Sequence, residues 1–141
     1  MTLEELLKSK RIYEQKVLQA DINALLEKAE SDLRTAEKIF SESIPWAYTI
    51  TYNAVLQASR AFVFSQGYRP ASSEAHKNTF LFLEAMLGED LKTLVTFFDR
   101  VRVKRHQAVY DARSDITETE AESLLSKAKN FVLLLRKRIK Q

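Results

Sequence analysis

Hydrophobic residues recur at helical spacing along most of the chain. Apolar positions three and four residues apart predict an amphipathic helix over about residues 21–42, with Asp21 as a suitable N-cap. A second helix is expected over Pro45–Gln66, because proline suits the first turn of a helix and Gly67 suits a left-handed stop. This stretch is apolar on most sides, which predicts a central position in the fold.

Three more helices are indicated further along the chain. Ser72 or Ser73 is expected to cap a third helix that ends at Gly88, and a fourth helix is expected over about residues 89–112. A capping-box pattern in "DITETEAESLL" precedes a fifth helix, whose apolar residues form one stripe. Four long amphipathic helices with short connections predict an all-α, up-and-down bundle of four to five helices.

The first twenty residues follow a different pattern. Thr2 with Glu5 reads as a capping box for a short N-terminal helix, and the stretch after it has no convincing period. We therefore expect an N-terminal helix and arm over residues 1–20 and a single helical domain over residues 21–141.

Composition narrows the possible classes of function. The chain has 141 residues and a formal net charge of +3, which is too small to indicate nucleic-acid binding by itself. It has no cysteine, so disulfides and thiolate metal sites are excluded. With only His76 and His106 available as imidazole ligands, neither a metal site nor a cofactor is expected, and His76 is interpreted as a capping-region or surface residue. No leader or membrane-spanning stretch is apparent, so a cytoplasmic location without membrane attachment is expected.

Positive charge is concentrated in one short segment, "RVRVKRH", within the fourth expected helix. At helical spacing, Arg105 falls within about 20° of Phe98, so it lies on the apolar stripe of that helix. A guanidinium on an inward stripe must either extend to an edge or meet an acceptor, because burying it unpaired is costly. Arg105 is therefore the predicted anchor of a site.

A second row lies beside Arg105 on the same helix. Arg102, His106 and Tyr110 stand at four-residue steps and together offer a guanidinium, an imidazole and a phenol. Arginine binds phosphate in a forked geometry, and histidine transfers protons near neutral pH, so the combination suits RNA or a nucleotide. The candidate catalytic residues are His106 and Arg105. The candidate phosphate-binding residues are Arg100, Arg102, Arg105, Tyr110 and Asp111.

Four segments in series, "LLEKAESDLRTAEKIF", "AYTITYNAVLQASRAFVFSQGYRPASSEAH", "RVKRHQAVYD" and "ITETEAESLLSKAKNFV", carry a resemblance to a known family. In this order they resemble the HEPN domain superfamily over about residues 22–135, in the compact subgroup whose motif ends in Tyr-Asp. The resemblance implies a four- or five-helix bundle and a homodimer whose motif helices face a shared cleft. It also implies frequent partnership with a minimal nucleotidyltransferase in toxin–antitoxin pairs.

Many HEPN proteins are metal-independent ribonucleases with an arginine, a polar residue and a histidine five positions after the arginine. By resemblance the arginine is Arg105 and the polar residue is His106, but the fifth position after Arg105 is Tyr110. An alternative register that begins at Arg100 makes His106 the catalytic histidine.

Three functions follow from this reading. The favoured one is a HEPN module that binds RNA or nucleotide at a basic dimer cleft, as part of a toxin–antitoxin system. The alternative is an active metal-independent endoribonuclease that uses Arg102, Arg105 and His106. The third is a structural dimerisation bundle in which the basic residues only form ion pairs with Asp99, Asp111 and Asp115.

Overall fold

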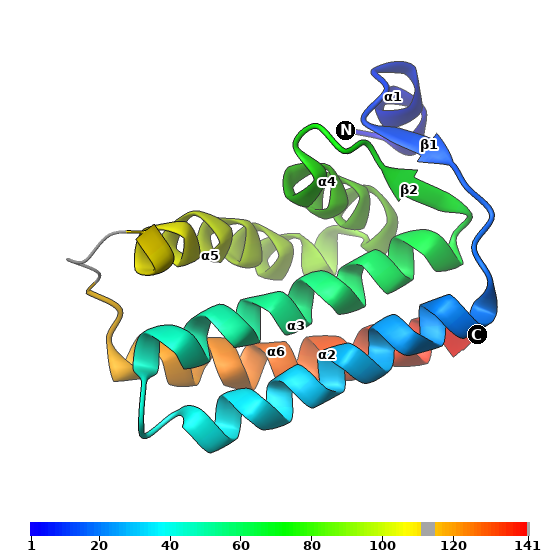
Figure 1. Ribbon diagram of the computed structural model, residues 1–141. Coiled ribbons are helices and arrows are strands. Elements are labelled where there is room, and N and C mark those ends of the chain that lie inside the picture. Colours follow the sequence, from blue (N-terminus) through cyan, green and yellow to red (C-terminus); the bar gives the residue numbers. More distant parts are fainter. Residues whose placement is uncertain (111–114, 141) are drawn as a thin grey trace.

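The computed structural model of the chain describes residues 1–110 and 115–140. Almost all of this part is helical (Figure 1). The described part contains six α-helices, one short 3-10 helix and two short strands, in the order α1–β1–α2–α3–β2–α4–η1–α5–α6. The predicted all-α helical bundle is confirmed. No helix in this described part is long and apolar enough to cross a lipid bilayer.

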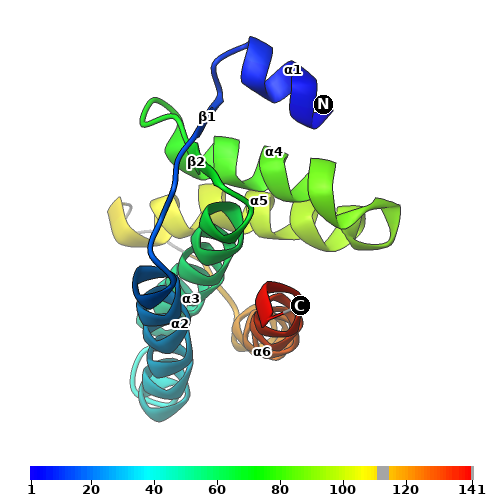
Figure 2. The same cartoon turned by 90° about the vertical axis from the view of Figure 1, so that its right-hand side faces the viewer.

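Three long helices run alongside one another and two further helices cover one side of them. Seen end-on in Figure 2, α2 (Gln19–Ile39), α3 (Ile44–Ser65) and α6 (Glu118–Lys140) point toward the viewer, whereas α4 (Ala75–Leu87) runs across them. The helix α5 (Lys92–Tyr110) follows α4 and lies beside it. Because α3 contacts α2, α4, α5 and α6, it occupies the central position that its apolar surface predicts.

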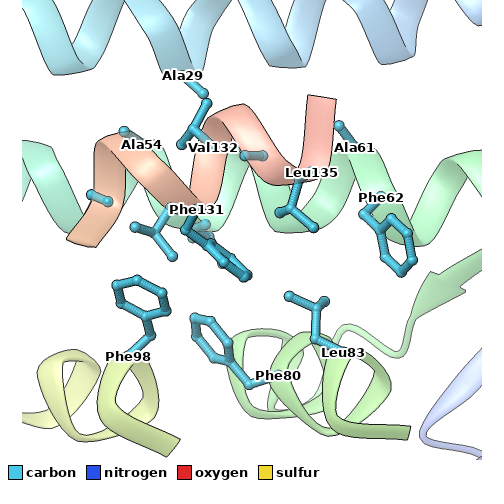
Figure 3. Close-up of a cluster of buried hydrophobic side chains, with 14 of the residues drawn as sticks. Ala29, Ala54, Ala61, Phe62, Phe80, Leu83, Phe98, Phe131, Val132 and Leu135 are labelled. Carbon is cyan, nitrogen blue, oxygen red and sulfur yellow. The ribbon is translucent and has the colours of Figure 1, made fainter. Parts of the chain in front are cut away.

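Aromatic rings from different helices meet in the core (Figure 3). Phe98 of α5 and Phe131 of α6 are fully buried, with ring centroids 4.9 Å apart. Phe80 and Leu83 of α4 point into the same space, and Ala29 of α2 lies on its opposite side. Rings of this size dominate core energetics, so this cluster fixes α4 and α5 against the three-helix layer.

The ends of α3 agree with the prediction, whereas the start of α2 does not. Ser43 caps α3 by accepting a hydrogen bond from the Trp46 amide at 3.3 Å, and Gly67 follows α3 with φ +88°. The prediction for α3 is therefore confirmed. The predicted cap of α2 is wrong, because the observed N-cap is Leu18, three residues before Asp21, which lies inside the first turn. There a carboxylate still complements the positive end of the helix.

The start of α4 also differs from the prediction. Its N-cap is Glu74 in the left-handed region, with φ +57°, and its side chain makes no capping hydrogen bond. The predicted serine cap is wrong because the side chain of Asn78 donates to the Ser73 carbonyl oxygen at 2.8 Å, which holds the preceding loop from inside the first turn.

The fourth predicted helix is divided in two. Residues 89–91 form the 3-10 helix η1 (Glu89–Leu91), and α5 begins at Lys92. The predicted end near Ala112 lies outside the described residues. The capping box before α6 is confirmed in part, because the Glu120 amide donates to Thr117 Oγ1 at 3.1 Å.

The N-terminal segment packs on the bundle through a short sheet. The helix α1 (Leu3–Lys8) is capped by Thr2, as predicted, and the strand β1 (Ile12–Glu14) pairs antiparallel with β2 (Tyr68–Pro70). Neither strand was predicted, because three residues are too few to show a period of two. Leu6 and Ile12 are buried in the common core, so this segment is fastened to the bundle.

Candidate functional site

Arg105 lies against the aromatic ring of Tyr52, a residue of the central helix. Its guanidinium carbon is 5.2 Å from the ring centroid, within the range of a cation–π contact. Its Nε atom is buried and has no hydrogen-bond partner among the described residues. The inward direction predicted for Arg105 is therefore confirmed, and its acceptor is an aromatic face rather than a carboxylate.

Tyr52 joins this arginine to a histidine on a third helix. The side chain of Tyr52 is 1% exposed, and its hydroxyl lies 3.0 Å from Nδ1 of His76. Burial raises the pKa of Tyr52 well above its ordinary value, and the nearby charges of Arg105 and Arg102 offset this only in part. The phenol therefore stays protonated at neutral pH. Arg105, Tyr52 and His76 form one connected group, which we call the aromatic bridge.

His76 is held in its neutral form. It is the second residue of α4 and half-buried, and burial is the main reason that its pKa is lowered from 6.5. The positive charges of Arg105, Arg102 and Arg60 lower the pKa of His76 further. A neutral imidazole beside guanidinium groups can accept or donate a proton at its free nitrogen.

An open cavity of about 560 Å³ lies in front of the aromatic bridge, between the first turn of α4 and the second half of α5. The short connection at Gly88 folds α4 and α5 into a helical hairpin, which places these two segments side by side (Figures 1 and 2). The charged and titratable side chains that line this first cavity are Glu74, His76, Lys77, Arg102, Arg105 and His106. Cationic groups therefore outnumber the single carboxylate.

Two of the cationic side chains that line the cavity form ion pairs, which neutralise part of its positive charge. Arg102 Nε contacts Asp99 Oδ1 at 3.0 Å, and Lys77 Nζ lies 3.6 Å from Glu74 Oε2. The pair with Asp99 agrees with the interpretation of the basic residues as structural. Arg105 does not fit that interpretation, because no carboxylate of the described residues lies within salt-bridge distance of it.

The predicted site residues are only partly brought together. Arg102, Arg105 and His106 line the first cavity, whereas Arg100 is exposed and does not line it. Tyr110 is 75% exposed, and its ring centroid lies 4.6 Å from that of His106, at the rim. Asp111 lies outside the described residues.

Two residues of the site, Tyr52 and His76, were missed by the sequence interpretation. They are 24 positions apart and on different helices, so no local spacing connects them. His76 lies in the first turn of α4, in the capping region as predicted, but its side chain is half-buried against Tyr52 rather than at the surface. The position of Tyr52 on a central apolar helix does not indicate which residue its hydroxyl contacts.

A second cavity of about 510 Å³ adjoins the first and shares Ala75 and His76 with it. Polar side chains of α3 line it, together with Arg69 of β2. These residues are Asn53, Gln57 and Arg60.

The arrangement suits an anion. Arg105 and Arg102 offer forked donors, and the first turn of α4 presents the positive end of a helix dipole to the first cavity. No group of three or more side chains able to hold a metal ion occurs in residues 1–110 and 115–140.

Comparison with known proteins adds the family. No curated protein matches the chain. The family model described as the HEPN domain matches residues 22–138, which include every helix from α2 to α6 apart from short ends. The chain therefore belongs to the HEPN domain family.

Proposed function

We propose that the protein binds the phosphate groups of RNA or of a nucleotide in the first cavity. The observation that carries the proposal is Arg105, whose Nε is buried without a partner among the described residues while its guanidinium carbon lies over the Tyr52 ring. A charged donor without an acceptor costs stability. A phosphate in the first cavity, which Arg105 lines, brings the opposite charge to this guanidinium.

The surroundings of Arg105 support the same ligand. Lys77, Arg102 and His106 line the same cavity, and its volume of about 560 Å³ is large enough for a nucleotide. Membership of the HEPN family agrees with RNA or a nucleotide as the ligand.

The test is binding of a fluorescent single-stranded RNA, measured by anisotropy at several salt concentrations. We expect the affinity to fall steeply between about 50 and 200 mM salt, because bound phosphates release counterions. Arg105→Ala should weaken binding at every salt concentration and lower the salt slope by about one. Arg34→Ala is the control, because Arg34 is exposed on α2 and lines neither cavity. Binding that ignores both salt and Arg105→Ala would contradict the proposal.

A second candidate function is metal-independent cleavage of RNA. It is favoured by the position of His106, which lines the same cavity as Arg102 and Arg105. Cleavage of this kind needs a base for the 2′-hydroxyl and positive charge for the phosphorane, and these three residues offer both.

Partnership with a minimal nucleotidyltransferase in a toxin–antitoxin pair stays part of the proposal. What supports it is the family alone. Co-expression of this chain with a nucleotidyltransferase encoded beside it, followed by size-exclusion chromatography, tests it. Separate elution of the two proteins would contradict it.

A further inference from the structure

The second cavity has the chemistry of a nucleobase site. Arg60 and Arg69 line it, and none of its lining side chains is a carboxylate. Asn53 and Gln57 lie one helical turn apart on α3 and contribute two amides to the same wall. Amides and guanidinium groups are the side chains that recognise base edges by paired hydrogen bonds.

Hydrogen bonds hold the side chains of Asn53, Gln57 and Arg60 in place. Arg60 Nη1 donates to Gln57 Oε1 at 3.0 Å, and Asn53 Nδ2 donates to Asp32 Oδ2 at 2.9 Å. An amide carries two N–H donors and a carbonyl, and a guanidinium carries five N–H donors, so each of these groups keeps further capacity. Gln57 is only 8% exposed, so its orientation is also fixed by packing. A preorganised wall of this kind binds with little loss of side-chain entropy.

An aromatic ring supports the guanidinium of Arg60. The guanidinium carbon lies 5.6 Å from the centroid of Phe64, and both residues line the second cavity. Guanidinium planes and aromatic rings are the surfaces on which unstacked bases are held. The second cavity thus offers a flat face as well as edge-reading groups.

His76 and Ala75 line both cavities. The charge of Arg60, in the second cavity, and that of Arg105, in the first, both act on the His76 imidazole. A phosphate held by Arg105 and a base held by Arg60 therefore lie on the two sides of one residue. A single nucleotide contains these two groups joined by a ribose.

We infer that the second cavity is a purine-binding subsite for the nucleotide whose phosphate is held by Arg102 and Arg105. This inference rests on the proposed function of the first cavity. Purines are favoured because both amides and guanidinium groups form their bidentate contacts with the N7 edge, which pyrimidines lack. The same chemistry serves a free nucleotide or a nucleotide within an RNA strand, and the test separates these sources.

The test is calorimetric titration of the full chain with AMP, GMP, UMP and ribose 5-phosphate. We expect AMP or GMP to bind at least about tenfold more tightly than ribose 5-phosphate, the discrimination typical of one good base contact. Arg60→Met keeps the apolar stem over Phe64 but removes the donors, and should reduce the purine nucleotide to the affinity of ribose 5-phosphate. Its control is Arg34→Met, which should change neither affinity.

A second variant, Gln57→Glu, is needed in case Arg60→Met impairs folding. Gln57→Glu keeps the shape and the acceptor for Arg60 but replaces the amide donor, so it should also remove the purine preference. Both variants should leave the affinity for ribose 5-phosphate within about twofold, because the phosphate contacts lie in the first cavity. Circular dichroism should show unchanged helix content.

The outcomes distinguish the subsite from the phosphate site. If all four compounds bind equally and Arg105→Ala weakens them all, the subsite is wrong and the proposed function stands. If none binds, purine-only and pyrimidine-only single-stranded RNA hexamers give the same comparison. A purine preference seen only there, and lost in Arg60→Met, supports the subsite and assigns it to RNA. Absence of binding in both sets overturns the subsite and the proposed function together.

Discussion

Arg105 makes one favourable contact, with Tyr52, but its buried Nε atom lacks a hydrogen-bond partner among the described residues. Its cation–π contact with Tyr52 is worth about 0.5–2 kcal/mol, depending on how far the pair is desolvated. A buried donor without a partner costs about 1–3 kcal/mol, so the Nε atom offsets much of that gain. A residue that contributes so little to stability and still lies beside an open cavity is typical of a ligand-binding residue.

The role of His106 separates cleavage from binding. If the protein is a ribonuclease, His106→Ala should lower the cleavage rate about a hundredfold or more and leave RNA affinity nearly unchanged, because proton transfer contributes on that scale. The measurement is single-turnover cleavage of a labelled RNA, with and without a chelator. If the protein only binds RNA, the wild type should show no cleavage. His106→Ala should then change the RNA affinity only slightly.

The matched variant for this test is His76→Gln. Since His76 is the other imidazole that lines the first cavity, it identifies which histidine transfers the proton. Chelator-resistant cleavage that survives His106→Ala and disappears in His76→Gln would contradict the assignment of His106.

Stability should depend on pH through His76. Its pKa is lowered by folding, so the folded state binds fewer protons than the unfolded state below pH 6.5. This contribution to stability is fully present above 6.5, and it is lost as the pH falls toward the lower pKa of the folded state. Urea denaturation from about pH 7.5 to about pH 5 should show a smaller decline for His76→Gln than for the wild type. If the free energy of unfolding of the two proteins depends on pH in the same way, His76 does not contribute to the pH dependence of stability, and the prediction is contradicted.

At the scale of elements, α3 is the helix that both cavities depend on. Tyr52 supports Arg105 at the first cavity, while Asn53, Gln57 and Arg60 line the second. The cap at Ser43 and the left-handed turn at Gly67 fix where this helix starts and ends. A change at either end is therefore expected to reach both cavities through one rigid element.

Gly67→Ala should destabilise the protein by about 1 kcal/mol, because an L side chain is strained at positive φ. There is open space around the position of a Cβ at Gly67, so the cost comes from the backbone alone. The control is Gln66→Ala, at a neighbouring residue with φ −90°, which should change stability by less than about 0.5 kcal/mol. Urea denaturation midpoints measure both changes, and equal midpoints for the two variants would contradict the prediction.

At the scale of the whole molecule, α5 carries apolar side chains that the single chain does not cover. Val103 is 51% exposed, Val109 is 38% exposed and Tyr110 is 75% exposed. Val103 and Tyr110 are two turns apart and so lie on one face of the helix. Exposed apolar groups beside a polar cavity are typical of an interaction surface.

We propose that two copies of the chain associate through this face of α5, near Arg102, Arg105 and Tyr110. Light scattering at micromolar concentration should give the mass of a dimer, and Val103→Glu should shift it toward 16.3 kDa, because a carboxylate disfavours an apolar contact. Leu18→Glu is the control, since Leu18 is 71% exposed at the start of α2. A wild-type protein that is strictly monomeric would contradict the proposal.

The sequence by itself determined where the long helices lie along the chain and, for α2 and α6, which face is buried. In α2 and α6 the apolar period is regular, so Ile22, Leu26, Phe131 and Leu135 could be assigned to the core before any contact was known. The inward direction of Arg105 followed from the same spacing. These features are local, because they depend only on residues within a few turns of one another.

The tertiary structure alone decided what surrounds Arg105. Tyr52 and His76 meet it from α3 and α4, and the hairpin of α4 and α5 places them around one cavity. The same long-range packing made β1 a strand and excluded Arg100 from the cavity. A helical period specifies the direction of a side chain, but its partner is set by how distant helices pack, which no local pattern encodes.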